Sequence, residues 1–245
     1  MMRQAIPLAV GLLATMACGT RVSAPWQPQA NSQPISPSSI MDFTLLYARN
    51  CAGCHGPDGK GGAAIGLADP VYLAIADDAA IRRVTAEGVA GTAMPAFAQH
   101  AGGMLTDAQI DAIVSGVRSH WAKPDVLRGA DTPPYATQAP GDPKRGAAVY
   151  RTFCSSCHGA SGQGGQRASS IVDGSYLGLV SNQGLRTTVI VGRPELGAPD
   201  WRGDVPGKPM SPGDVSDVVA WLAAQRPQFP GQPYSSALKP DGGVQ

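Results

Sequence analysis

The 245-residue chain has few charged residues and few aromatic side chains. Charged residues make up 15 % of the sequence and the formal net charge is +1, so no basic surface of the kind that binds nucleic acid is expected. Phe (4), Trp (4) and Tyr (6) are sparse beside 31 Gly and 22 Pro. This composition predicts loop-rich domains with too few large apolar side chains to fill an ordinary core.

Cysteine and long apolar runs are scarce as well. Of five Cys, four belong to a motif that occurs twice and only Cys18 remains, which excludes a disulfide framework. No apolar run reaches the roughly 20 residues needed to cross a bilayer, so no transmembrane helix is predicted. The apolar stretch of residues 5–17 follows a basic start and has the length of a secretory signal.

Cys18 resembles the acceptor cysteine of a bacterial lipoprotein signal. Ala17 before it fits that pattern, whereas Thr15 stands where Leu is usual. We therefore predict a signal peptide over residues 1–18 and a lipid on Cys18 that anchors an exported protein to the periplasmic side of a bacterial membrane. Residues 19–37 are predicted to be a disordered tether. The alternative is an ordinary signal in which Cys18 is removed or has no role.

The motif C-x-x-C-H occurs twice in the chain. Two thiols three residues apart on a helical turn reach the two vinyl groups on one edge of a porphyrin, and the following His supplies the proximal nitrogen to the iron. A single C-x-x-C also suits a zinc or thiol redox site. Two copies, each followed by Gly and a Gly-rich run, favour two covalently bound haem c groups, whose apolar faces would complete the core. The predicted attachment residues and iron ligands are Cys51, Cys54 and His55, and Cys154, Cys157 and His158.

The motifs belong to two copies of one unit. A shift of 103 residues takes His55 to His158, and a shift of 104 takes Gly88 to Gly192. One-residue slips of this kind are typical of loop insertions in duplicated domains. The two units are therefore expected to share one fold.

Each unit is predicted to be helical. In the first unit, Ser38 or Ser39 is expected to cap a helix over residues 40–50. The other expected helices are residues 70–75 and 78–87, a closing helix from a capping box at Thr106 to about residue 120, a helix started by Asp142 and Pro143, and a closing helix over about 212–225.

With a helix entering C-x-x-C-H, a Met-bearing loop and a closing helix, each unit resembles a class I cytochrome c domain. The resemblance implies an all-α fold of two tandem class I cytochrome c domains, in which first and last helices cross and haem lies edge-exposed in a crevice. The expected organisation is domain 1 over 38–122, a Pro-rich linker over 123–141, domain 2 over 142–226 and a Pro-rich tail over 227–245.

In that family a Gly on the first helix commonly lets an aromatic residue of the last helix cross closely. Gly146 and Trp221 fit this pattern in the second unit, whereas Phe43 and Gly116 stand at the matching positions of the first. We predict that small and large residues have changed places, so that each pair fills one helix contact. The alternative is that both Gly residues are incidental.

Met94 is the predicted distal ligand of the first haem. It precedes the closing helix, and Pro95 stiffens the loop that carries it. A thioether favours ferrous iron and, together with the proximal His, leaves no iron position free for substrate. A packing role in the core is the non-ligand alternative. The rival ligands are Met104, His100 and His120.

The second unit has no Met at the corresponding place, because the shift of 104 sets Ala198 against Met94. Met210 is the only Met or His after the second motif, and it also precedes a closing helix. It is therefore the predicted ligand. The alternatives are that Met210 packs like Leu105, to which the repeat aligns it, and that the haem is five-coordinate or bound by Lys208.

Arg82 and Arg186 occupy equivalent positions in the repeat. Because a guanidinium group suits carboxylates, the pair is interpreted either as haem-propionate partners or as part of a solvated helix face. Tyr72 and Tyr176 are expected to pack in the haem pockets rather than act as redox relays.

These features predict a di-haem c-type cytochrome that transfers electrons between redox partners at the outer face of a bacterial membrane, as a carrier or as a subunit of a respiratory or photosynthetic complex. The expected partners are an oxidase, a quinol-oxidising complex or a reaction centre, and the near-neutral charge favours a tethered partner over a diffusing one. The protein is predicted not to be an enzyme. The alternative is a haem enzyme that uses an open second haem site.

Overall fold

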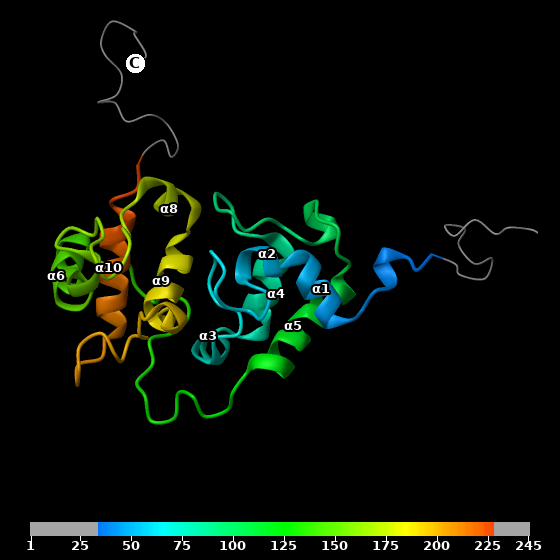
Figure 1. Cartoon of the computed structure of the whole chain (residues 1–245), viewed down its shortest axis with the longest axis horizontal. Coiled ribbons are helices and arrows are strands. Elements are labelled where there is room, and N and C mark those ends of the chain that lie inside the picture. Colours follow the sequence, from blue (N-terminus) through cyan, green and yellow to red (C-terminus); the bar gives the residue numbers. More distant parts are fainter. Residues whose placement is uncertain (1–33, 228–245) are drawn as a thin grey trace, which may run out of the picture. The chain divides into compact units, whose positions relative to one another are not determined.

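The computed structural model describes residues 34–227, where helices are joined by loops (Figure 1). The predicted signal peptide with Cys18, all but the last four residues of the tether over 19–37, and all but Pro227 of the tail lie outside this range. No helix within it is both long and apolar enough to cross a lipid bilayer.

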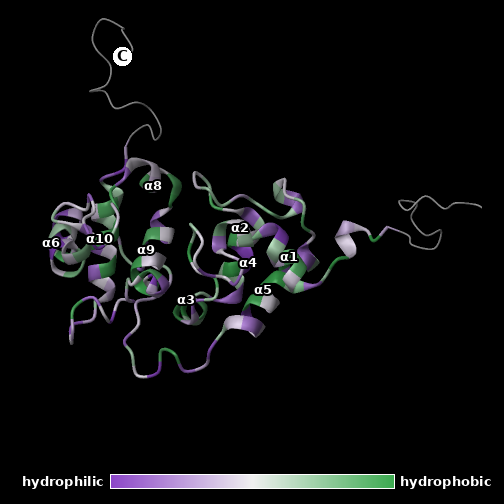
Figure 2. Cartoon of the chain, viewed as in Figure 1, coloured by the Kyte–Doolittle hydropathy of each residue, from purple (hydrophilic) through white to green (hydrophobic). Residues whose placement is uncertain are grey.

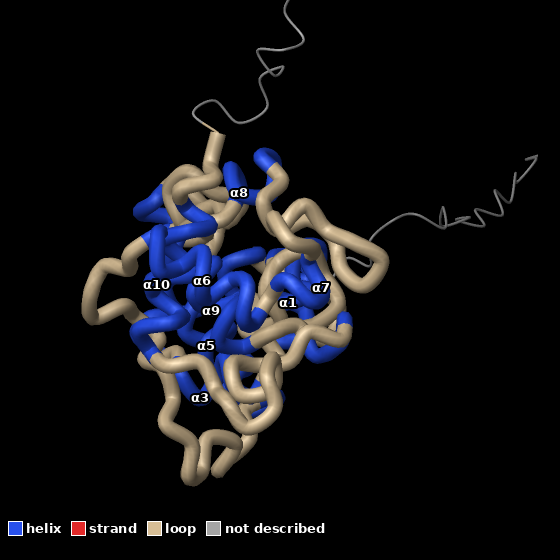
Figure 3. The backbone as a smooth tube through the Cα atoms, turned by 90° about the vertical axis from the view of Figure 1, so that its left-hand side faces the viewer, coloured by secondary structure: helices blue, strands red, loops and turns tan. Residues whose placement is uncertain are grey.

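Five α-helices appear twice in the same order. In the first unit they are α1 (Phe43–Asn50), α2 (Ala52–His55), α3 (Pro70–Ile75), α4 (Asp78–Glu87) and α5 (Asp107–Trp121). In the second they are α6 (Pro143–Phe153), α7 (Ser155–His158), α8 (Gly174–Leu179), α9 (Asn182–Val191) and α10 (Pro212–Ala223). Short 3₁₀ turns occur at Pro37–Ser39, Gln99–Ala101 and Pro194–Leu196. Residues 34–227 contain no β-strand (Figure 3), which confirms the predicted all-α class.

The helix starts follow the predicted caps in all but one case. Thr106 and Gln109 form the predicted capping box of α5: the Thr106 hydroxyl accepts from Gln109 N at 3.2 Å, and Gln109 Oε1 accepts from Thr106 N at 3.0 Å. Asp142 caps α6 as predicted. The expected cap of the first helix at Ser38 or Ser39 is wrong, because the Asp42 carboxylate accepts from Leu45 N at 2.8 Å and begins the helix at residue 43.

The closing helices carry the core of each unit. On α5 the four predicted inward residues, Ile110, Ile113, Val114 and Val117, are all buried. Hydrophobic and hydrophilic residues both occur along the helices (Figure 2), and buried apolar residues of the helices pack together in the core. Helix α5 packs on α1, and α10 packs extensively on α6. Each pair is the predicted crossing of first and last helix.

Both crossings have a glycine at the closest approach. A Cβ added to Gly116 on α5 would lie 2.1 Å from the Phe43 ring, and one added to Gly146 on α6 would lie 2.7 Å from the Trp221 Cβ. The predicted exchange of small and large residues is therefore confirmed. The two sites differ in one respect, because the Gly146 Cβ would also meet the Asp217 carbonyl oxygen at 2.0 Å. Backbone, and not only an aromatic side chain, fills that space.

A tryptophan ring reaches the same place in both units from different helix positions. The Trp121 ring lies 5.0 Å from the Tyr47 ring and borders Gly59, whereas the Trp221 ring stacks on Tyr150 at 4.3 Å and borders Gly162. Trp121 ends α5, but Trp221 lies within the last turn of α10. The loop after each motif is thus covered by an indole ring, although the repeat does not align the two Trp residues.

The linker is fastened to the second unit by Arg186. Its guanidinium group donates to Pro134 O at 2.8 Å and to Tyr135 O at 3.1 Å, and the residue is only 3 % exposed. Gln183 donates to the same Tyr135 oxygen at 2.8 Å. Burial lowers the pKa of Arg186, but three carbonyl and hydroxyl acceptors satisfy its charge.

By its internal contacts the chain divides between Ile35 and Ser36, and both helical units fall in the same part. Arg193 of the second unit donates from Nη2 to Gly62 O at 2.8 Å, in the loop that follows the first motif. The backbone N–H of Ala93 donates to Leu179 O at 3.4 Å. The predicted boundaries of the two domains stay predictions.

Candidate functional site

The two motifs form single helical turns at the end of the first helix of each unit. Cys51 precedes α2 and Cys54 lies within it, and Cys154 and Cys157 are placed in the same way around α7. Residues three apart on a turn lie on the same side of it. All four thiols are free, so each pair is available for two thioether bonds.

Each motif histidine is held by a backbone carbonyl. His55 Nδ1 lies 2.7 Å from Ile65 O, and His158 Nδ1 lies 2.8 Å from Ser169 O. Because a carbonyl oxygen only accepts, Nδ1 carries the hydrogen and the Nε2 lone pair of each ring is free to bind a metal. Burial lowers the pKa of His55, which keeps the ring neutral as ligation requires.

Two tyrosines fix the residue after each histidine, a role that we did not predict from the sequence. The Tyr47 hydroxyl donates to Gly56 O at 2.8 Å, and the Tyr150 hydroxyl donates to Gly159 O. Both glycines have positive φ, +85° at Gly56 and +79° at Gly159. A Tyr eight residues before each motif His was the available signal.

The segment with Met94 is clamped to the end of α4. Val89 N donates to Met94 O at 3.0 Å, and Met94 N donates to the Thr92 hydroxyl at 3.1 Å. Gly88 allows this approach, because a Cβ there would lie 2.8 Å from Met94 O. The backbone that carries the predicted sulfur ligand is therefore held rigidly, and Met94 as ligand stays a prediction.

The rival ligands for the first haem face elsewhere. Met104 is 83 % exposed and His100 is also exposed. His120 lies with its ring 4.6 Å from the Phe43 ring, and its Nδ1 is 2.9 Å from Gly116 O. These positions favour Met94 over the alternatives.

In the second unit, Ala198 takes the place of Met94. Arg193 N donates to Ala198 O at 2.9 Å, which repeats the Val89–Met94 hydrogen bond, and Gly192 again permits the approach. The sequence alignment of Met94 with Ala198 is thus confirmed by equivalent backbone contacts. No sulfur stands at this position of the second unit.

Met210 occupies the position of Leu105. Met210 N donates to Trp201 O at 2.9 Å, as Leu105 N donates to Phe97 O at 2.8 Å, and Met210 is only 2 % exposed. This contact supports the packing role that the repeat suggested as an alternative. Met210 as a ligand of the second haem stays a prediction.

The segment of residues 201–210 lies beside the second motif. Lys208 Nζ is 5.4 Å from the centre of the Phe153 ring. Burial is the main cause, and the negative charge of Asp204 the second, of a rise in the pKa of Cys154 to about 12. Burial, followed by the charge of Asp200, raises the pKa of Asp204 itself to about 6. The second motif therefore has a half-buried carboxyl group near Cys154.

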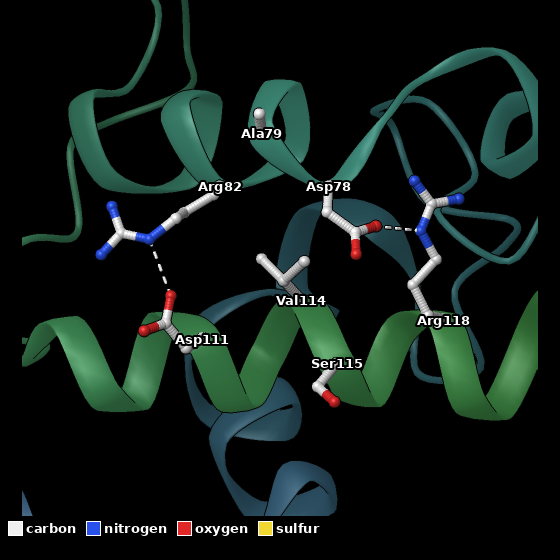
Figure 4. A pocket seen from close by; sticks show the side chains of 7 residues that line it. All are labelled: Asp78, Ala79, Arg82, Asp111, Val114, Ser115 and Arg118. Atoms are coloured by element: carbon white, nitrogen blue, oxygen red, sulfur yellow. Dashed lines mark hydrogen bonds and ion pairs between the residues drawn. The ribbon is translucent and has the colours of Figure 1, made fainter.

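The arginines that we considered as propionate partners are engaged within the protein. Arg82 Nε donates to Asp111 at 2.7 Å, and its Nη2 donates to Asp107 at 3.0 Å. Figure 4 shows Arg82 turned towards Asp111 in a groove between α4 and α5, with Arg118 paired to Asp78. Together with the contacts of Arg186 to the linker, these pairs argue against the propionate interpretation. Arg82 lies on a solvated helix face, as the alternative interpretation expects, whereas Arg186 is buried.

The residues present fit a covalently attached haem in each unit. Two free thiols on one turn, a neutral imidazole with a free Nε2 and a fixed ring orientation are the donor set that haem c requires. Within residues 34–227 no three His, Cys, Asp or Glu side chains gather as a metal site without a porphyrin. A structural zinc site needs four such ligands, so the described residues do not support a zinc interpretation of the motifs.

Comparison with known proteins agrees with this donor set. The family model described as cytochrome c oxidase, cbb3-type, subunit III matches residues 39–115 and 141–222, one segment for each helical unit. The two segments cover the greater part of the chain and contain both motifs.

Curated relatives are subunits of a cbb3-type cytochrome c oxidase and of a cytochrome bc1 complex. The cbb3-type cytochrome c oxidase subunit FixP of Azorhizobium caulinodans is 29 % identical over 191 residues, which cover 73 % of this chain and 57 % of that protein. The cytochrome bc1 complex cytochrome c subunit of Mycobacterium tuberculosis is 29 % identical over 152 residues, 60 % of this chain and 51 % of that protein. The chain thus spans about half the length of these relatives.

Among solved structures, a reducing HAO-like protein complex of Kuenenia stuttgartiensis matches 76 % of this chain and 96 % of its own. The identity is 16 % and the TM-score is 0.42. At these values the match adds no argument about function.

Proposed function

The chain belongs to the family described as cytochrome c oxidase, cbb3-type, subunit III, and from that premise we propose that it is a di-haem electron-transfer protein at the outer face of a bacterial membrane. Membership of this cytochrome c family implies covalently bound haem c, and the related subunits are electron-transfer proteins of respiratory complexes. Three statements go beyond family membership and are our proposal: that the chain binds two haems, that it lies at the outer face of a membrane, and that it serves a respiratory complex.

The observation that carries the proposal is the pair of matched histidines. In each unit, Nδ1 is hydrogen-bonded to a carbonyl in the loop after the motif, and Nε2 is left for iron beside two free thiols. One-electron redox chemistry is what haem supplies when bound. The protein's part is to hold the proximal rings, exclude water and present docking surface.

The first test is the mass and spectrum of the purified chain. We expect a mass that exceeds the polypeptide by two haem groups, and a Cys51→Ala/Cys54→Ala variant and a Cys154→Ala/Cys157→Ala variant that each lose one. A colourless chain, or one with a single haem in the unmutated protein, would contradict the proposal.

The distal ligands are tested by ferric absorption and electron paramagnetic resonance spectra. With Met94 and Met210 as ligands, both haems are low-spin, and Met94→Ala and Met210→Ala each remove one thioether signature. Two low-spin haems leave no open iron position, which is the state expected of an electron carrier.

The anchoring and the partner are tested by fractionation. If Cys18 carries a lipid, the chain is recovered with membranes and Cys18→Ser releases it into the periplasmic fraction. Purification from mild detergent then distinguishes a free carrier from a subunit, which copurifies with oxidase, quinol-oxidising or reaction-centre proteins. The relatives from cbb3 oxidase and the bc1 complex support a respiratory partner.

A second candidate function is favoured by Ala198 at the place of Met94. If Met210 only packs as Leu105 does, the second haem has an open iron position and can bind a small ligand or substrate. Carbon monoxide binding to the reduced protein distinguishes the two functions: no binding supports the carrier, and one equivalent bound at the second haem supports a reactive site.

A further inference from the structure

Arg193 of the second unit binds the loop that follows the first motif (residues 56–69). Its Nη2 donates to Gly62 O at 2.8 Å, and its Nε donates to Glu195 Oε1 at 2.6 Å. The Arg193 side chain is 18 % exposed and that of Glu195 is 25 % exposed. Because the planar guanidinium group is bonded on two sides and largely shielded from water, its direction towards Gly62 is fixed.

The fold of the second unit does not need the Arg193 side chain. A shift of 104 residues sets Arg193 against Val89, and the backbone of each holds the equivalent hairpin: Val89 N donates to Met94 O at 3.0 Å, and Arg193 N donates to Ala198 O at 2.9 Å. Any residue with a backbone N–H supplies that bond. Valine has no side-chain donor, so the contact runs from the second unit to the first and has no counterpart in the other direction.

Gly62 lies directly against the backbone of the first motif. A Cβ added to Gly62 would meet Cys54 O and would lie 2.7 Å from the carbonyl carbon of His55. Two residues further along, Ala64 N donates to Cys54 O at 2.9 Å, and Ile65 O lies 2.7 Å from His55 Nδ1. Residues 62–65 are therefore one short segment, packed on the motif, that carries the carbonyl partner of the predicted iron ligand.

The loops after the two motifs are held in different ways. In the first loop, residues 60–63 make no hydrogen bond between backbone groups, although the structure describes all four. In the second loop (residues 159–173), Gly164 N donates to His158 O and Gly165 N donates to Ala168 O, both at 2.9 Å. The second loop thus closes on itself, whereas the first is held at Gly62 by Arg193.

We infer that Arg193 is a positioning residue for the first haem centre: by binding Gly62 O, it fixes the segment whose Ile65 carbonyl orients the His55 ring. The inference rests on the proposed attachment of haem to the first motif. A hydrogen bond at Nδ1 sets the rotation of an imidazole ring and makes its Nε2 a stronger ligand. The first centre therefore depends on a side chain of the second unit.

The test is Arg193→Val in the full chain with both haems, because Val is the residue of the first unit at this position. Haem content of the unmutated protein is measured first by mass, so that a failure of haem attachment is distinguished from a failure of this inference. In the reduced, ¹⁵N-labelled variant, we expect the His55 Nδ1–H and the Ala64 N–H to exchange with solvent at least about tenfold faster, since a hydrogen bond from a charged donor is lost. The His158 Nδ1–H is the internal reference and keeps its rate.

Two control variants separate positioning from a change of charge and from a general loosening of the chain. Glu195→Gln changes the charge but keeps a side-chain oxygen that accepts from Arg193 Nε, so the His55 exchange rate should stay the same. Arg202→Val removes another arginine of the second unit that donates to an earlier carbonyl, Val126 O at 3.3 Å, and should also leave that rate unchanged. Equal acceleration in Arg202→Val would overturn the inference.

A conservative variant supplies a second readout with the charge retained. Lys in Arg193→Lys has a single ammonium group and cannot keep both bonds of the guanidinium group. The midpoint potential of the first haem alone is expected to rise, because a weaker Nδ1 hydrogen bond makes the His55 ring a poorer ligand for ferric iron. An unchanged first-haem potential in this variant would count against the role of Arg193.

A third measurement is made on the unmutated protein and does not depend on the folding of Arg193→Val. With ¹⁵N-labelled arginine, the Arg193 guanidinium resonances are identified by their absence in Arg193→Lys, and their hydrogens are expected to exchange slowly with solvent. Fast exchange of these hydrogens, or an unchanged His55 exchange rate in Arg193→Val with both haems present, would overturn the inference.

Discussion

Around the two C-x-x-C-H motifs, the two helical units are built alike. A tyrosine hydroxyl holds the glycine after each motif histidine, at Tyr47 and Tyr150, and a loop carbonyl holds each imidazole at 2.7 Å and 2.8 Å. On the distal side, Met94 and Ala198 share one backbone position and Leu105 and Met210 share another. Duplication has kept the part that we propose to attach haem and has changed the part from which the distal ligands are expected to come.

The largest effect is expected from removing the thioether sulfur at position 94 of the first unit or adding one at the matching position 198 of the second. Met94→Ala is expected to turn the first haem high-spin and to lower its midpoint potential on the order of 100 mV, because axial ligands set haem potentials over about 0.8 V. Ferric spectra and a potentiometric titration measure both changes. Ala198→Met is the matched variant in the second unit.

The outcome of Ala198→Met decides how far the two distal sides differ. If Met210 is the natural ligand, the second haem is low-spin before and after the change. If the second haem is high-spin in the unmutated protein and becomes low-spin in Ala198→Met, the prediction that Met210 binds iron is wrong.

The two helix crossings are expected to differ in their tolerance of one methyl group. Gly146→Ala places a Cβ against the Asp217 carbonyl oxygen at 2.0 Å, so it should cost about 3 kcal/mol and should not be rescued by Trp221→Ala. The three atoms nearest to a Cβ on Gly116 all belong to the Phe43 side chain, the first at 2.1 Å, so the Phe43→Ala/Gly116→Ala double variant should recover much of the loss. Urea unfolding of the haem-loaded variants gives both coupling free energies. Equal rescue in the two units would contradict the difference.

The equivalent arginines offer a third contrast. Arg186→Ala leaves the linker carbonyl of Pro134 without its buried donor, removes one of the two donors to Tyr135 O, and is expected to destabilise the second unit by about 2–3 kcal/mol. Arg82→Ala removes exposed ion pairs and is expected to have little effect. Thermal unfolding followed by haem absorption measures both. An Arg82→Ala loss as large as that of Arg186→Ala would contradict the assignment.

The smallest expected effect is a pH dependence confined to the second haem. Burial raises the pKa of Asp204 from 3.8 to about 6, so folding favours the neutral carboxyl and this stabilisation is lost as pH rises from about 4 to 6. The carboxylate formed above pH 6 favours ferric iron. The midpoint potential of the second haem should therefore fall by tens of millivolts as pH rises through about 6.

Asp204→Asn is the control for this pH dependence. The amide cannot ionise, so the potential of the second haem should keep its low-pH value across the transition. The first haem has no counterpart of Asp204 and should show no inflection near pH 6 in either protein. An equal inflection at both haems would point to a group other than Asp204.

The sequence determined whatever depends on residues close together in the chain. The spacing of Cys51, Cys54 and His55 was sufficient to predict attachment, and the caps at Thr106 and Asp142 were sufficient to place the starts of α5 and α6. The repeat carried these predictions to the second unit. The exchange of Phe43 with Gly116 was also visible, because volume at a crossing is shared between two aligned positions.

Only the tertiary structure decided contacts between side chains far apart in the sequence. The partners of Arg186 are 51 and 52 residues away, and no local pattern distinguishes a linker clamp from a propionate partner. The rings of Trp121 and Trp221 converge on one place from helix positions that the repeat does not align. Arg193 and its acceptor Gly62 are 131 residues apart, so their contact exists only once the chain has folded. Local spacing specifies which groups can react, whereas burial and long-range packing decide which acceptors, charges and cofactor groups they meet.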